Sequence, residues 1–190
     1  METKTAFLNG KLVSLRPVNE NDADTLVRWI NDPEVTHFIS SGVFPNSHAQ
    51  EVSWIRGLDD KKDNLVLVIE TAKGIPIGTV GLHRINWVDR TGTTGALIGE
   101  KEYWGKGYGT EAKILLLHHA FTRMNLRTIS SSVIAFNERS YRALRKQGYV
   151  EVGRMPKWHY RDGKYHDQIM LILTKQAFMR KWNIFKTSLV

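Results

Sequence analysis

Hydrophobic and polar positions recur with two different periods along this chain of 190 residues. Alternation at every second residue, or enrichment in β-branched residues, predicts strands at 11–16, 65–70, 75–82, 92–99, 127–135, 149–159 and 165–173. Apolar residues at helical spacing, together with caps and stops around them, predict helices at 23–30, 34–39, 47–58, 108–123, 137–147 and 175–185.

Turn residues mark the boundaries between these elements. Asn19 or Asn21 can cap the first helix, and the run at 31–33, Asn-Asp-Pro, stops it. Gly148 is a natural stop for the helix before it. The pair at 162–163, Asp-Gly, predicts the turn of an antiparallel hairpin between the last two strands.

The order of the elements predicts the topology of the sheet. The strands before and after helix 108–123 are joined by a crossover and should be parallel, whereas the other neighbours should be antiparallel. The predicted fold class is α/β (α+β), with a mixed, mostly antiparallel central sheet of about seven strands and helices on both faces. The sequence contains no linker or internal repeat, which predicts a single domain over residues 1–190.

Residues 103–112 read Tyr-Trp-Gly-Lys-Gly-Tyr-Gly-Thr-Glu-Ala, and three glycines alternate where a long apolar helix begins. The first turn of a helix has unpaired N–H groups and the positive end of the helix dipole. Glycines there let a phosphate or pyrophosphate approach the backbone closely. The dinucleotide pattern G-x-G-x-x-G fits poorly, and G-x-x-x-x-G-K-[ST] is absent. A turn that only caps the helix is the alternative.

The same stretch resembles the acyl-CoA loop of the GNAT superfamily of N-acetyltransferases, [QR]-x-x-G-x-[GA]. Gly107-Tyr108-Gly109 fit its end, and Trp104 stands where Gln or Arg is commonest. Residues 137–149 resemble a second GNAT signature, N-x-x-[AS]-x-x-x-[YL]-x-K-x-G-[FY]. Residues 29–35 and 160–167 resemble elements of the subgroup that includes ribosomal-protein alanine N-acetyltransferases and spermidine acetyltransferase. The order of the predicted elements is also that of the GNAT fold.

This resemblance implies direct transfer of an acetyl group from acetyl-CoA, the cosubstrate, to a primary amine. It implies that the strand before the loop offers backbone groups to the thioester, that the loop holds the pyrophosphate, and that Asn137 contacts the pantetheine or acetyl region. The cofactor-binding residues so implied are Leu97, Ile98, Gly99, Trp104, Gly105, Lys106, Gly107, Tyr108, Gly109, Thr110 and Asn137. Plain strand packing for Leu97 and Ile98, a solvated Lys106, and a helix N-cap at Asn137 are the alternatives.

The candidate general acids are two hydroxyl groups. Many relatives place a Tyr seven residues after the motif Asn, but this chain has Leu144 there. Ser140 shares the helix face of Leu144, and in the N-terminal acetyltransferase subgroup a Ser at this place is a proposed acid. Tyr141 is the other hydroxyl near that face. A thiol with a pKa of about 8.5 also leaves readily without an acid.

The candidate base is a carboxylate or a water bound to one. Glu100 after the strand is our first candidate, and Glu34 and Glu70 are the others. Relatives often have an acid on the strand before the loop, near Thr93 or Thr94, where this chain has none. For Glu100 itself, an ordinary solvated acid is the favoured alternative.

Composition limits the chemistry, the cellular location and the partners that the sequence allows. The absence of cysteine excludes a disulfide framework, a thiolate metal site and a cysteine nucleophile. No signal peptide or membrane-spanning run is present, so we expect a cytoplasmic protein without a membrane partner. Seven histidines do not form a metal-binding pattern, and no metal is expected. The net charge of +8 suits a polyanionic cofactor or an acidic partner; direct nucleic-acid binding is the less favoured explanation.

The predicted function is an acetyl-CoA-dependent N-acetyltransferase acting on a protein N-terminus or on an amino-sugar or other small-molecule amine. The alternatives are a polyamine or aminoglycoside acetyltransferase and a non-catalytic CoA-binding interaction domain. The positive charge argues against a polycationic acceptor. A protein substrate and a homodimer are compatible with the sequence. The aromatic residues Trp87, Trp158, His159 and Tyr160 could line the acceptor side, or pack in strands.

Overall fold

The computed structural model describes residues 6–39, 43–59 and 62–189. In these residues eight strands and six α-helices follow one another in an order that confirms the predicted mixed α/β class. The strands are β1 (Leu8–Asn9), β2 (Val13–Pro17), β3 (Leu65–Thr71), β4 (Pro76–Asn86), β5 (Thr91–Ile98), β6 (Thr128–Ile134), β7 (Val150–Arg161) and β8 (Lys164–Thr174). The helices are α1 (Ala23–Ile30), α2 (Pro33–Thr36), α3 (His48–Asp59), α4 (Tyr108–Thr122), α5 (Glu138–Gln147) and α6 (Lys175–Leu189).

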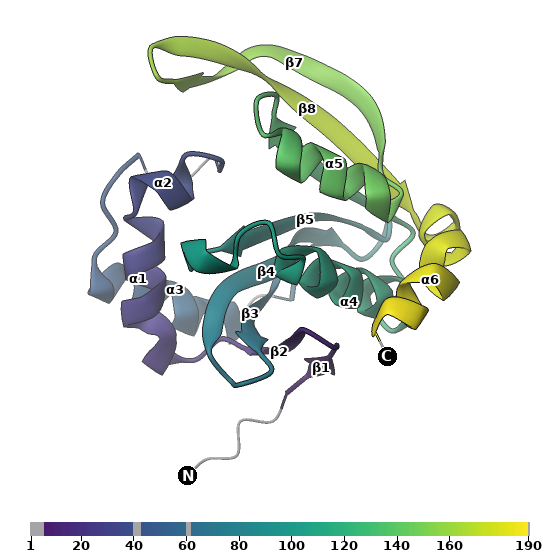
Figure 1. Ribbon diagram of the computed structural model, residues 1–190, viewed down its shortest axis with the longest axis horizontal. Helices are drawn as coiled ribbons and strands as arrows, with labels where there is room; N and C mark the ends of the chain where they lie inside the picture. The colour runs from purple at the N-terminus through teal and green to yellow at the C-terminus, as the bar shows by residue number, and fades with distance from the viewer. Residues whose placement is uncertain (1–5, 40–42, 60–61, 190) are drawn as a thin grey trace.

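All eight strands form one sheet in the order β1-β2-β3-β4-β5-β6-β8-β7. The pair β5–β6 is parallel and every other pair is antiparallel, as predicted. The sequence pattern missed β1, because a strand of two residues has no measurable periodicity. The hairpin β7–β8 turns at Asp162 and Gly163, whose φ angles of 51° and 75° are those the Asp-Gly pair favours. In Figure 1 this hairpin arches beyond α5.

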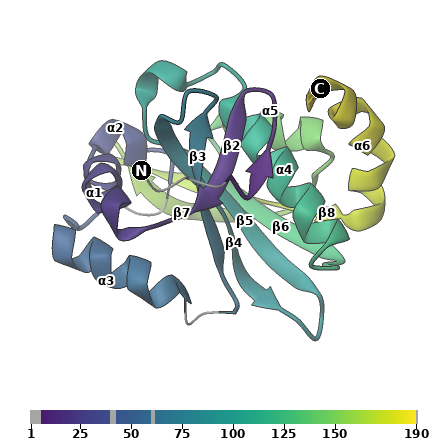
Figure 2. The ribbon, with the colours of Figure 1, turned by 90° about the horizontal axis from the view of Figure 1, so that it is seen from below.

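Helices cover the two faces of the sheet. The central helix α4 packs the apolar residues of β2–β5 on one face, and Leu116, Leu117 and Phe121 are fully buried there. The helices α1 and α3 form a second, smaller cluster around Trp29 on the other face. Figure 2 shows α1, α2 and α3 on one side of the sheet and α4 and α6 on the other. The helices predicted from periodicity therefore have the two-sided arrangement expected of them.

The boundaries differ from the predictions at the N-terminal end. The strand predicted at 11–16 begins at Val13 and includes Pro17 as its last residue. Asn19 caps a short 3₁₀-helix, Glu20–Asp22, before α1 begins, because Asn19 and Asp22 form a reciprocal capping box. The helix predicted at 34–39 is the single turn α2, which Pro33 starts and which ends at Thr36.

Candidate active site

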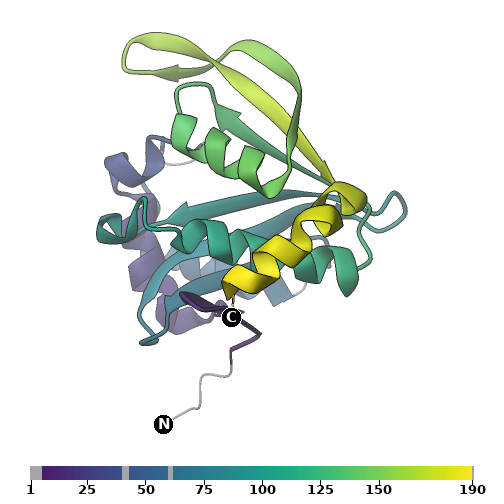
Figure 3. The same cartoon turned by 45° about the vertical axis from the view of Figure 1, so that its right-hand side comes forward.

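The parallel strands β5 and β6 separate at the centre of the sheet. Their pairing covers only Thr91–Thr93 against Thr128–Ser130, whereas β5 continues to Ile98 and β6 to Ile134. We call the region formed by residues 94–98 and 131–134 the β5–β6 fork. Figures 1 and 3 show β5 running between α4 and α5. Within the described residues, the fork leaves the backbone edge of β5 without a strand partner on this side.

Polar side chains fill the closed end of the fork. The ammonium of Lys113, on α4, donates to Ser131 Oγ at 3.1 Å. Ser131 in turn donates to the carbonyl of Thr94 at 3.1 Å, and the Thr94 hydroxyl lies 2.8 Å from Tyr149 Oη. All four residues are buried. These side-chain bonds replace the ladder bonds that β5 and β6 would otherwise exchange.

Backbone direction distinguishes the three strand residues predicted to meet the thioester. Gly99 donates its N–H to Ile77 O at 2.9 Å, toward β4. Successive residues of an antiparallel ladder present their backbone groups to alternate sides, so Leu97 also faces β4 and Ile98 faces the fork. The Ile98 carbonyl accepts from Trp104 Nε1 at 2.7 Å. The N–H of Ile98 is therefore the group directed into the fork.

The glycine loop, residues 105–109, follows β5 and leads into α4, next to the open end of the fork. Gly105 and Gly107 have φ angles of 73° and 93°, in the left-handed region that favours glycine. Gly107 is the N-cap of α4 and no described side chain caps the helix, so the N–H groups of its first turn are available to a ligand. Lys106 is exposed, and Thr110 lies in that first turn. The predicted loop therefore has the backbone geometry of an anion cradle.

Two neighbouring residues have structural partners that the sequence pattern did not reveal. A Cβ on Gly99 would overlap the ring of Trp29 at 2.1 Å, so this glycine is required by α1 packing. The carboxylate of Glu100 accepts from Trp29 Nε1 at 3.0 Å and forms an ion pair with Arg28. Hydrogen bonding to Arg28 is the main cause that lowers the pKa of Glu100. A carboxylate with a lowered pKa is a weaker base.

The other predicted carboxylates are also paired with cations. Glu34 lies 2.6 Å from the ammonium of Lys101. Glu70 is buried and accepts from Arg16 Nε at 2.7 Å, within a cluster that also holds Asp22. Each of the three carboxylates considered as a base is therefore engaged by a cationic side chain.

The start of α5 carries the predicted acid residues. Asn137 Oδ1 accepts from the backbone N–H of Ser140 at 3.1 Å, so Asn137 is a helix N-cap and is itself buried. The Ser140 hydroxyl makes no hydrogen bond to another described residue. The hydroxyl of Tyr141 donates to Glu151 Oε2 at 3.0 Å. The two candidate acids thus differ in whether the hydroxyl is already engaged.

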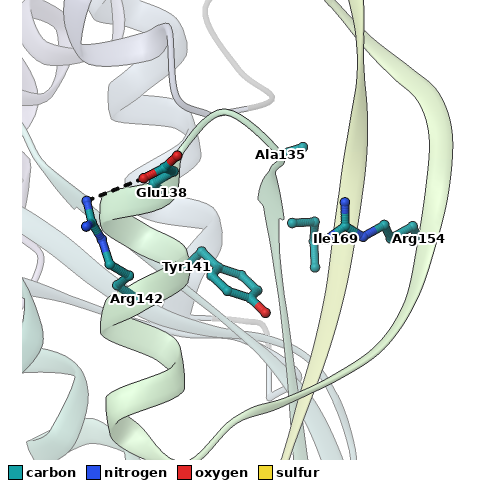
Figure 4. A pocket seen from close by; sticks show the side chains of 6 residues that line it. All are labelled: Ala135, Glu138, Tyr141, Arg142, Arg154 and Ile169. Atoms are coloured by element: carbon teal, nitrogen blue, oxygen red, sulfur yellow. Dashed lines mark ion pairs between the residues drawn. The ribbon is translucent and has the colours of Figure 1, made fainter.

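Tyr141 also lines a cavity of about 350 Å³ between α5 and the β7–β8 hairpin. Figure 4 shows its ring directed from α5 toward the strands that carry Ile169 and Arg154, with the ion pair of Glu138 and Arg142 on α5. Neither a glycine-loop residue nor Ser140 lines this cavity. The cavity is therefore distinct from the β5–β6 fork.

Aromatic side chains from distant segments gather beside the glycine loop. Phe38, after α2, lies with its ring centre 6.4 Å from that of Trp104 and 5.9 Å from that of Phe136. The guanidinium of Arg139 lies 5.0 Å from the centre of the Trp104 ring. The expectation that Trp87 is near this region was wrong, because Trp87 belongs to the β4–β5 turn at the opposite end of β5.

The other three aromatic residues lie on the hairpin. Trp158 and Tyr160 are exposed on β7, and His159 Nε2 lies 2.9 Å from Gln168 Oε1 on β8.

Among the residues described, no group of three or more His, Cys, Asp or Glu side chains could hold a metal ion. In the same part of the chain no helix is long and apolar enough to cross a membrane.

Comparison with known proteins identifies the family. A family model described as Acetyltransferase (GNAT) domain matches residues 13–150. The chain is 26% identical over 170 residues to "Uncharacterized N-acetyltransferase p20" of Bacillus licheniformis, covering 87% of this chain and 94% of p20. The crystal structure of a "putative acetyltransferase" from T. thermophilus matches with a TM-score of 0.78 and 26% identity, and the match covers 100% of both chains.

A second solved structure shares the fold at lower sequence identity. The spermidine N-acetyltransferase from Vibrio cholerae, in complex with CoA and spermine, has a TM-score of 0.82 and 21% identity. The match covers 88% of this chain and 98% of that one. The present chain belongs to the GNAT acetyltransferases: it is an N-acetyltransferase that uses acetyl-CoA as its cosubstrate and an amine as its acceptor.

Proposed function

We propose that acetyl-CoA lies in the β5–β6 fork with its thioester carbonyl hydrogen-bonded to the N–H of Ile98. The observation that carries this proposal is the early end of the β5–β6 pairing, which leaves that N–H directed into the fork. A fixed N–H donor stabilises the negative charge that develops on the carbonyl oxygen during attack. Donors of this kind contribute about 2.7–4 kcal/mol to the stability of the transition state.

In the same proposal the pyrophosphate lies over the N–H groups of residues 105–110. The left-handed Gly105 and Gly107 expose these groups, and the N-terminal end of α4 favours an anion. The role of Trp104 is to hold the loop against β5 through the bond to Ile98 O. Asn137 orients the first turn of α5 toward the pantetheine arm.

The test of this cofactor site is Gly107→Val, measured by calorimetric titration with acetyl-CoA. A β-branched residue cannot adopt a φ of 93° without strain, so the loop must change shape and affinity should fall at least about tenfold. Gly74→Val is the matched control, because Gly74 has a φ of 73° in the exposed β3–β4 turn. A folded Gly107→Val protein with unchanged affinity would overturn the site, as would an equal loss in the control.

We assign the general acid to Ser140 rather than to Tyr141. The Ser140 hydroxyl has no partner among the described residues, and it lies one turn from Leu144, where relatives carry a Tyr. Tyr141 already donates its hydroxyl proton to Glu151. A hydroxyl without a partner can turn toward the departing thiolate at no cost in an existing bond.

We further propose that the acceptor is a neutral or acidic molecule with a primary amine, such as a protein N-terminus or an amino-sugar nucleotide. The support is electrostatic. Three carboxylates near the glycine loop, those of Asp32, Glu34 and Glu100, are paired with Lys101 or Arg28. The net charge is +8, so a polycation meets repulsion and few unpaired carboxylates.

A polyamine is the second candidate acceptor, favoured by the similarity to the spermidine N-acetyltransferase solved with CoA and spermine. A protein substrate, a homodimeric assembly and a cytoplasmic location are parts of the same proposal that rest on the sequence alone.

A further inference from the structure

His83 lies on the face of the sheet opposite α4, beside the strand that borders the fork. Its neighbour Leu82 is fully buried in the core beneath α4. Since side chains alternate along a strand, His83 and Gly81 point to the face that carries α1–α3. His83 pairs with Thr93 on β5 and is half-buried, so solvent reaches the ring.

In the imidazole of His83, Nδ1 has a hydrogen-bond partner among the described residues and Nε2 has none. His83 Nδ1 lies 3.2 Å from Asn64 Oδ1. The amide of Asn64 is oriented by its own bond, in which Nδ2 donates to Asp63 Oδ1 at 2.9 Å. Its oxygen therefore faces the ring, and the Nδ1 atom carries the proton. The lone pair of Nε2 is then available, and no described residue is bonded to it.

Two glycines make room for that nitrogen next to β5. Gly81 and Gly95 are paired across β4 and β5. A Cβ on Gly81 would stand 2.8 Å from His83 Nε2, and one on Gly95 would stand 3.8 Å from it. The free nitrogen thus lies over Gly81 of β4 and beside Gly95 of β5. Leu97, on the same face, is about 7 Å further along the strand, a distance that two hydrogen-bonded waters can span.

The charged group that acts on the ring is Arg84, the next residue on β4. The neighbouring Thr93 and Ser130 present neutral hydroxyls, which bond to each other at 2.8 Å, and Asp63 is reached only through Asn64. Burial, and then the charge of Arg84, lower the pKa of His83. The ring is therefore neutral near pH 7 and able to accept a proton.

We infer that His83 is the general base of the acetyl transfer, removing a proton from the acceptor ammonium through a chain of hydrogen-bonded waters that begins at Nε2. This inference rests on the thioester position proposed above. The freed amine forms a C–N bond at the thioester carbon, the C–S bond breaks, and the sulfur leaves with the electron pair. Ser140 protonates the thiolate and regains a proton from the attacking nitrogen or from solvent, and His83 returns its proton to solvent. Unlike the three candidate carboxylates, His83 has no cationic hydrogen-bond partner among the residues that the structure describes.

The test compares His83→Gln with the wild type and with His119→Gln. His119, on α4, is likewise half-buried with its pKa lowered by burial, and it packs against Phe7. We expect His83→Gln to lower kcat at least about 10²-fold with acetyl-CoA affinity unchanged, and to remove the acidic limb of the kcat/KM profile. His119→Gln should keep the activity and the limb. A His83→Gln protein with wild-type kcat, or with the same limb, would overturn the inference.

A second variant keeps the inference testable if His83→Gln does not fold. Asn64→Asp places a carboxylate at Nδ1, which should raise the pKa of His83 and move the acidic limb upward by about one pH unit. A limb that stays in place would overturn the role of His83. Failure of the wild-type protein to bind acetyl-CoA at the loop would instead overturn the cofactor site, so the two failures are distinguishable.

Discussion

Replacing Lys113 by Met tests the physical account of the closed end of the fork. Lys113 is only 6% exposed, and its ammonium has a single hydrogen-bond partner among the described residues, Ser131. The ring of Tyr149 lies 5.4 Å from the ammonium and offers a weak cation–π contact in addition. No carboxylate of the described chain compensates the charge, and burial lowers the pKa of Lys113 to about 7. Methionine has a similar length and no charge, so it isolates the cost of the buried amine.

The magnitude follows from proton linkage. The pKa of Lys113 is lower in the folded chain than the ordinary value of 10.5, so the folded state binds fewer protons between the two values. The stability penalty is full below pH 7 and is relieved as the pH rises toward 10.5. Between pH 7 and pH 9 the free energy of unfolding of the wild type should therefore rise by about 2 kcal/mol from this residue alone. The rise is absent in Lys113→Met.

The assay is urea unfolding at pH 7, 8 and 9, followed by tryptophan fluorescence and by circular dichroism. We expect Lys113→Met to be more stable than the wild type at pH 7, with an advantage that shrinks by about 2 kcal/mol at pH 9. Lys73→Met, at an exposed position of the β3–β4 turn, is the matched control and should follow the wild-type curve. A difference between Lys113→Met and the wild type that stays constant across this range would refute the reasoning.

Two further predictions concern the reaction. Ser140→Ala should lower kcat by about 10²-fold with acetyl-CoA affinity unchanged, whereas Tyr141→Phe should lose only the bond to Glu151 and keep its turnover; wild-type turnover in Ser140→Ala would assign the proton to Tyr141 or to water. In a panel of spermidine, short peptides and amino-sugar nucleotides at matched concentration, peptides or amino-sugar nucleotides should have the highest kcat/KM. Spermidine as the best acceptor would show that the charge argument is wrong.

The order of the elements could be predicted because it depends on local signals. Periodicity located the strands and helices. Gly148 marked the end of α5, and the Asp162-Gly163 pair marked the turn between β7 and β8, as the structure has them. The parallel β5–β6 pair followed from a rule of connectivity rather than from any residue. Short elements without a full period, such as β1 and α2, were missed or misplaced by a few residues. Local patterns thus describe the scaffold well.

The polar chemistry of the site could not be predicted, because it depends on contacts between distant residues. A lysine within a helical pattern is typical of a solvated face, and only the packing of α4 over Ser131 shows that Lys113 is buried. The oriented ring of His83 depends on Asn64, which is 19 residues away in the chain. Its only sequence signal was a histidine directly after the predicted strand 75–82, a pattern too common to be informative.

Gly99 was predicted as a cofactor-binding residue, but the structure explains this glycine by its packing against Trp29. The resemblance to GNAT enzymes places it among residues that meet the cofactor, but its N–H is donated to Ile77 and its missing side chain is required by Trp29. Trp29 also bonds to Glu100, the residue that follows, so α1 fixes the end of β5 at two adjacent positions. Trp104 then fixes the glycine loop to Ile98. The exposed loop is therefore anchored through two tryptophans, and the N–H of Ile98 is held in place before any cofactor binds, which is what preorganised stabilisation of an oxyanion requires.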